Sequence, residues 1–181
     1  MKFRLALALT CLAAITRLLP HPDNFTPIGA MALFGAAYFS HQARMLLVPF
    51  LALFVSDLVL NNVIYSQYYT GFTFITSWWI YLAFALVMLT GWALLSQKVT
   101  PARLLFASLT ASLLFFIVTN FSTWLGSGMY PRTPAGLTAC FAAGLPFLRN
   151  TVLGDLFFSG VMFGAYEWMM KRQLAGKAAS L

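Results

Sequence analysis

The acidic residues are the groups in this chain best suited to chemistry. The 181 residues include only four of them, Asp23, Asp57, Asp155 and Glu167, while 61% of the chain is hydrophobic and 8% is charged. A carboxylate within an apolar segment is costly, so it usually marks either an ion pair or a functional site. The chemistry to consider is therefore ion pairing inside the protein, or hydrogen bonding to a ligand.

Two of these acids belong to polar stripes with helical spacing. Asp57 has Asn61 four residues later, and Asp155 has Thr151 and Ser159 at the same spacing on either side. Residues four apart share one face of a helix. We expect Asp155 to lie in the first turn of the last apolar segment, where the helix dipole favours a negative charge.

The sequence lacks the residue combinations of known catalytic and metal sites. Its histidines are His21 and His41, and Ser127 is the glycine-flanked serine outside the apolar segments; no HExxH or Walker motif and no paired glutamates occur. Cys11 and Cys140 have no second ligand at metal-site spacing. We therefore expect no enzymatic activity, no metal and no cofactor.

The composition shows which solvent surrounds the protein. Soluble domains carry about 25% charged residues, and a chain of this size could not hide so much apolar surface from water. We expect an integral membrane protein whose main partner is the lipid bilayer. The net charge of +7 then marks cytoplasmic loops rather than a nucleic-acid partner.

Turn residues and charges divide the chain into six apolar segments. They predict an all-α fold, a single six-helix transmembrane domain over residues 1–181, with spans at about 3–19, 27–39, 45–60, 72–95, 103–125 and 150–170. The last connector, residues 126–149, is rich in Gly and Pro, and it could carry a short surface helix at 135–144.

The basic residues predict how these spans are oriented. With the N-terminus inside, eight basic residues face the cytoplasm: Lys2, Arg4, Arg44, Lys98, Arg103, Lys171, Arg172 and Lys177. Three face outward: Arg17, Arg132 and Arg149. Because cytoplasmic loops carry the excess of Lys and Arg, both termini are predicted to be cytoplasmic.

Polar and aromatic side chains gather on the predicted outer side. Small-molecule pockets are mostly apolar, with a few placed polar groups. The candidate ligand-binding residues are Asp57, Asn61, Arg149, Asp155, Asn24, Tyr130 and Arg132. Buried ion pairs that only brace the fold are the alternative, and the sequence leaves both open.

Small residues recur four apart in three segments. The pairs are Ala32 and Ala36, Ala107 and Ala111, and Gly160 and Gly164. Such pairs let a neighbouring backbone approach closely. They predict either packing inside the bundle or a docking face for another membrane subunit.

Three stretches carry a resemblance to known proteins. "RLLPHPDNFTPIGAMALFGAAYF", "SDLVLN" and "LPFLRNTVLGDLFF" resemble an uncharacterised family of small bacterial six-helix membrane proteins, over nearly the whole chain. That family in turn resembles the S components of energy-coupling-factor (ECF) vitamin transporters. The similarity lies in size, six spans, inward termini and a Gly-Asp pair, Gly154-Asp155, that opens the last helix.

The resemblance implies a multi-pass protein of the bacterial inner membrane that binds a vitamin or similar nutrient between its outer loops. It also implies a partner, an ECF transmembrane subunit with ATPases, which meets an AxxxA motif in the first helix. In this chain the nearest AxxxA pairs are Ala32/Ala36 and Ala107/Ala111, outside the first segment, so a solitary carrier is the alternative.

The leading hypothesis is thus a membrane protein for binding and uptake of a small organic nutrient, with an outward-facing pocket. The rival hypothesis is a non-transporting membrane scaffold or assembly subunit whose polar residues are purely structural.

Overall fold

The computed structural model describes residues 2–39 and 42–178, and within them the chain forms six α-helices and no β-strand. The helices are α1 (Lys2–Thr16), α2 (Ile28–Tyr38), α3 (Gln42–Val59), α4 (Trp78–Leu95), α5 (Pro101–Gly126) and α6 (Pro134–Ala178). A π-helical turn, η1 (Leu60–Ile64), and a 3-10 turn, η2 (Ser66–Tyr68), follow α3. The all-α prediction is confirmed. In the connector between the spans predicted at 27–39 and 45–60, Ser40 and His41 lie outside the described residues, and α3 already begins at Gln42.

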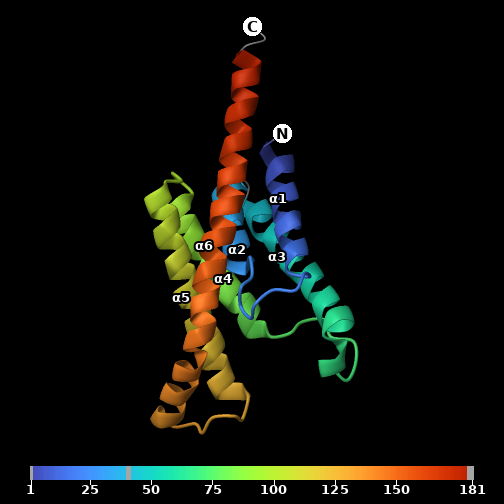
Figure 1. Cartoon of the computed structure of the whole chain (residues 1–181), viewed down its shortest axis with the longest axis vertical. Coiled ribbons are helices and arrows are strands. Elements are labelled where there is room, and N and C mark those ends of the chain that lie inside the picture. The colour runs from blue at the N-terminus through green and yellow to red at the C-terminus, as the bar shows by residue number, and fades with distance from the viewer. Residues whose placement is uncertain (1, 40–41, 179–181) are drawn as a thin grey trace.

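Successive helices run in alternating directions, so the N- and C-terminal ends of the described chain lie at the same end of the bundle (Figure 1). The connectors 17–27, 65–77 and 127–133 all lie away from the termini, and 127–133 lies at the far end of the bundle (Figure 1). Three helical stretches are long and apolar enough to cross a membrane: Leu46–Ile64, Trp78–Leu95 and Pro101–Gly126.

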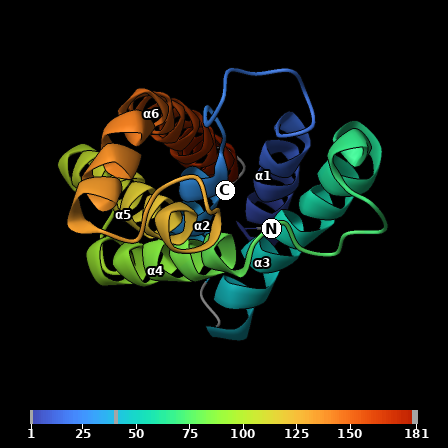
Figure 2. The ribbon, with the colours of Figure 1, turned by 90° about the horizontal axis from the view of Figure 1, so that it is seen from below.

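Helix α2 lies at the centre of the bundle, among the other five helices (Figure 2). Every residue from Ile28 to Ala36 is buried. A helix that is apolar on all sides, as this one is, must be surrounded by protein or lipid. Its many Ala and Gly residues let the surrounding helices come close.

The outer surface of the bundle is apolar. Large side chains are more than half exposed on several helices, including Leu51 on α3, Leu89 on α4 and Phe157 on α6. In water, an exposed apolar surface this extensive would promote association. It is the surface expected where the surrounding solvent is hydrocarbon.

The small-residue pairs fall into two groups. Ala32, Ala36, Ala107 and Ala111 are all buried inside the bundle, where Ala36 lies against Gly91 of α4. Gly160 and Gly164 instead lie on an open face of α6, with no other heavy atom within 4 Å of an added Cβ.

The largest difference from the predicted spans concerns α6. The sequence predicts a connector up to Arg149, whereas the helix begins at Pro134 and continues through Pro146. Proline removes one helical hydrogen bond, but packing on α5 offsets the loss. Gly144 fits closely against Asn120 of α5, and the side chain of Cys140 contacts the Asn120 carbonyl at 3.4 Å.

One consequence is that the prediction for the position of Asp155 is wrong. Asp155 lies deep within α6 rather than in its first turn, so the dipole of its own helix does not explain it. The fourth predicted span is also too long, because α4 begins at Trp78, and Ser77 caps it by accepting a hydrogen bond from the Trp79 backbone N–H.

Close packing of α2 on α3 can be tested at Gly35. A Cβ added there would collide with the ring of Pro49 on α3, and overpacking of this kind costs about 1–3 kcal/mol. Gly35→Ala is therefore expected to lower the thermal unfolding temperature of the detergent-solubilised protein. Gly160→Ala is the matched control, since that position is open and loss of a helical glycine stabilises by about 0.5–1 kcal/mol. Equal unfolding temperatures for the two variants would contradict this packing.

Candidate functional site

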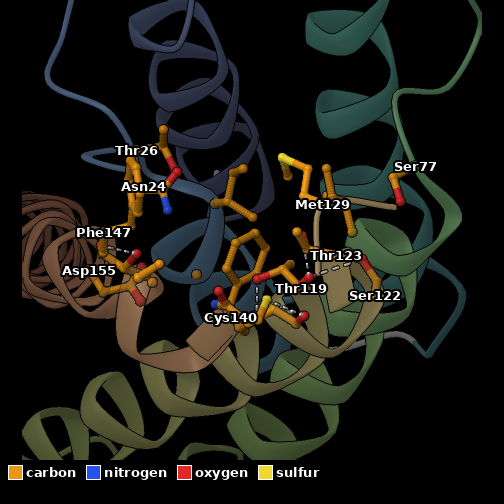
Figure 3. A pocket seen from close by; sticks show the side chains of 18 of the residues that line it. Asn24, Thr26, Ser77, Thr119, Ser122, Thr123, Met129, Cys140, Phe147 and Asp155 are labelled. Atoms are coloured by element: carbon orange, nitrogen blue, oxygen red, sulfur yellow. Dashed lines mark hydrogen bonds between the residues drawn. The ribbon is translucent and has the colours of Figure 1, made fainter. Parts of the chain in front are cut away.

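A cavity of about 560 Å³ opens at the end of the bundle opposite the termini (Figure 3). It is lined by the first residues of α2 and α4, the last turns of α5, the first half of α6, and the connectors 17–27 and 127–133. Its volume is within the usual range for small-molecule sites, about 300–1,000 Å³. The first and third outer connectors thus line one space, and connector 65–77 contributes only its last residue, Ser77.

The wall of the cavity combines apolar side chains with hydroxyl and amide groups. Its apolar part includes Ile28, Ile80, Phe115, Met129 and Phe147. Its polar part is Asn24, Thr26, Ser77, Thr119, Asn120, Ser122, Thr123, Tyr130, Thr151 and Asp155. Among the described residues that line it, Asp155 is the one ionisable acid, and none is Lys, Arg or His. The wall is suited to a small organic molecule with a few hydrogen-bonding groups.

Asp155 lies at the inner end of the cavity and is almost completely buried. Its Oδ2 accepts a hydrogen bond of 2.6 Å from the hydroxyl of Ser112 on α5. The carboxylate also interacts with the backbone N–H groups of Gly29 and Ala30 in the first turn of α2. Asp155 is therefore placed where it can cap the neighbouring helix α2, because Pro27, the residue that precedes α2, supplies no capping side chain.

Two glycines make this cap possible. A Cβ at Gly29 would collide with the Asp155 carboxylate, and a Cβ at Gly154 would lie 3.0 Å from the Thr26 backbone nitrogen. The Gly154-Asp155 pair thus brings the connector 17–27 close to α6 and then caps the helix that follows it. Asn150 adds a further tie, because its side-chain amide donates to the carbonyl of Asp23 at 2.9 Å.

Asp57 pairs with an arginine outside the cavity. The Arg17 guanidinium contacts Asp57 Oδ1 at 2.7 Å, and both side chains are buried. The hydroxyl of Tyr81 donates to Asp57 Oδ2 at 2.9 Å, and Arg17 also donates to Ser56. This cluster joins the end of α1 to α3 and α4, which is the bracing role that the sequence left open for these charges.

The other predicted site residues are dispersed. Asn61 lies beside this cluster and accepts a hydrogen bond of 2.9 Å from the hydroxyl of Thr76. Arg149 is exposed, and Arg132 is exposed and donates to the Leu125 carbonyl. Of the seven predicted ligand-binding residues, Asn24, Tyr130 and Asp155 line the cavity.

The contribution of α5 to the cavity was not predicted from the sequence. Thr119, Asn120, Ser122 and Thr123 form much of the polar wall. The signal was the run "TNFST", four polar residues among five at the end of an apolar segment. Within the described residues no group of three or more His, Cys, Asp or Glu side chains is placed to hold a metal ion.

Capping of α2 by Asp155 can be tested by unfolding. Loss of an N-cap costs about 0.5–2 kcal/mol, and Asp155→Ala also removes the partner of Ser112, so a marked fall in unfolding temperature is expected. Asp155→Asn keeps one acceptor oxygen and is expected to lose less. Asp23→Ala is the control, since it removes an exposed carboxylate from the neighbouring connector. An unfolding temperature for Asp155→Ala equal to that of the Asp23→Ala control would exclude the capping role.

Comparison with known proteins places the chain in a family without assigning an activity. None of the curated proteins and none of the solved structures compared with the chain matches it. A family model matches residues 1–178, nearly the entire length. The chain therefore belongs to DUF6580, a family of unknown function.

Proposed function

We propose that this protein binds a small organic nutrient, such as a vitamin, at the outer face of a bacterial inner membrane and takes part in its uptake, as S components of ECF transporters do. The observation that carries the proposal is the cavity of about 560 Å³ at one end of the bundle. Apolar walls with a few converging hydroxyl and amide groups are typical of sites for small organic molecules.

The proposed topology has six membrane passages with both termini in the cytoplasm. Support comes from the basic residues, which are concentrated near the end of the bundle that holds the termini. Helix α2, with 11 residues, is about 16 Å long, roughly half the thickness of a bilayer core of about 30 Å. Because its N-terminal residues line the cavity, the cavity occupies the part of the passage that α2 leaves unfilled.

The small-residue pairs bear on the choice of partner. Ala32, Ala36, Ala107 and Ala111 are buried in the bundle, so their AxxxA faces are already occupied by neighbouring helices. This arrangement favours a solitary carrier. If an ECF transmembrane subunit does dock, the open small-residue face is that of Gly160 and Gly164 on α6.

The topology can be tested by cysteine labelling in intact cells, starting from the variant Cys11→Ser/Cys140→Ser. Ser66→Cys and Ser127→Cys, exposed in two of the three predicted outer connectors, are expected to react with a membrane-impermeant thiol reagent. Ser96→Cys, exposed after α4, is expected to react only once the membrane is permeabilised. Labelling of Ser96→Cys in intact cells would rule out this orientation.

Nutrient binding can be tested by filling the cavity. Thr119 lines it, whereas Thr110 lies outside it on the same helix, and each hydroxyl donates to the carbonyl four residues earlier. Wild type and Thr110→Trp are expected to retain a co-purified small molecule detectable by mass spectrometry, and Thr119→Trp is expected to lose it. Vitamins are then tested one at a time. A vitamin that binds, supplied at about 100 times its Kd, should raise the unfolding temperature of wild type and Thr110→Trp by about 5–10 °C.

The rival function, a membrane scaffold with purely structural polar residues, makes the opposite prediction. No small molecule would co-purify, no vitamin would stabilise wild type, and Thr119→Trp and Thr110→Trp would behave alike. That outcome would reject the nutrient-binding proposal.

A further inference from the structure

Four of the seven hydroxyl groups on the cavity wall share one hydrogen-bonding pattern. Those of Thr119, Ser122, Thr123 and Thr151 each donate to a backbone carbonyl of their own helix, at 2.8 to 3.0 Å. A carbonyl oxygen can only accept, so each hydroxyl has already used its one hydrogen. What these side chains offer to the cavity is the oxygen lone pairs, which accept hydrogen bonds.

The carboxylate of Asp155 also favours ligands that donate hydrogen bonds. Asp155 is the one charged side chain among the described residues that line the cavity. The N-terminus of α2 beside it carries about half a positive charge, which offsets the carboxylate only in part. With the carboxylate ionised, the cavity wall around Asp155 is net negative.

The basic residues at this end of the bundle do not reverse that sign. Arg17 is paired with Asp57 in the buried cluster, and Arg132 donates to the Leu125 carbonyl. Arg149 lies two residues from Phe147 and from Thr151, which both line the cavity. At about 100° per residue, Arg149 therefore points to the opposite side of α6.

Aromatic rings complete the wall. Phe115, Tyr130 and Phe147 all line the cavity, and the face of an aromatic ring attracts a cation. Acceptor oxygens, a lone carboxylate and aromatic rings are a combination that favours hydrogen-bond donors and positive charge, and disfavours anions.

We propose that the cavity selects small organic cations, such as ammonium- or iminium-bearing ring compounds, over anions. This proposal rests on the proposed function, since it names the chemical class of the nutrient bound at the same site. It assigns Asp155 a second role beside capping α2: the carboxylate sets the sign of the potential that a ligand meets.

The test compares the reaction rates of two reagents of similar size and opposite charge. The variant Ser122→Cys, built on Cys11→Ser/Cys140→Ser, places a thiol in the cavity wall in an isosteric exchange. Purified protein in an uncharged detergent is treated with methanethiosulfonates that carry either a trimethylammonium or a sulfonate group, and modification is followed by intact-protein mass spectrometry. Ser66→Cys in the same background is the control, since Ser66 is exposed and outside the cavity.

We expect the cation-to-anion rate ratio at position 122 to exceed that at position 66 by about tenfold. Adding Asp155→Asn is expected to remove most of this excess. Equal ratios at the two positions would overturn the proposal, as would failure of both reagents to react at position 122, because the cavity would then be closed to solutes. The comparison of positions 122 and 66 in protein that retains Asp155 tests the cation selectivity even if the Asp155→Asn variant does not fold.

The two proposals fail in distinguishable ways. Equal rate ratios together with a retained nutrient would reject cation selectivity and leave nutrient binding in place. A tenfold ratio with no co-purified molecule would reject nutrient binding and show that the negative potential of the cavity is real.

Discussion

The arrangement of the bundle depends on the contact between Asp155 and the first turn of α2. The first N–H groups of any helix have no partner within the helix, so a buried helix start needs partners from elsewhere in the protein. Helix α2 is buried along its length and is preceded by Pro27, which supplies no side-chain cap. A carboxylate from α6 meets this need, and Gly29 leaves the space for it.

The need to pair every buried polar group also explains the positions of the few buried charges in this chain. In the hydrocarbon region a buried charge must be paired or hydrogen-bonded. Arg17 and Asp57 neutralise each other between α1 and α3, with Tyr81 of α4 as a further partner. These contacts join the end of α1 to α3 and α4 beside the central helix α2.

The cavity follows from the shortness of α2. A central helix of only 11 residues leaves space beyond its N-terminus, and the ends of α4, α5 and α6 enclose that space. Asp155 lies between the start of α2 and the cavity. In the proposed site, its carboxylate both caps the first turn of α2 and gives the cavity its negative charge. Structural and ligand-binding roles, which appear as alternatives in the sequence, are compatible in this geometry.

The sequence by itself determined the all-α class and the approximate bounds of most apolar helices, because lipid permits only long apolar segments between short polar turns. It also indicated that polar residues gather on one side, since charge and turn residues can be counted directly. Only the tertiary structure decided which partner each charge meets. Arg17 and Asp57 are 40 residues apart in sequence, and Asp155 meets the start of α2 far earlier in the chain, so no local pattern could specify these contacts. The early start of α6 was likewise decided by packing on α5, which overrides the local signal of Pro146 because a well-packed neighbour compensates for one lost hydrogen bond.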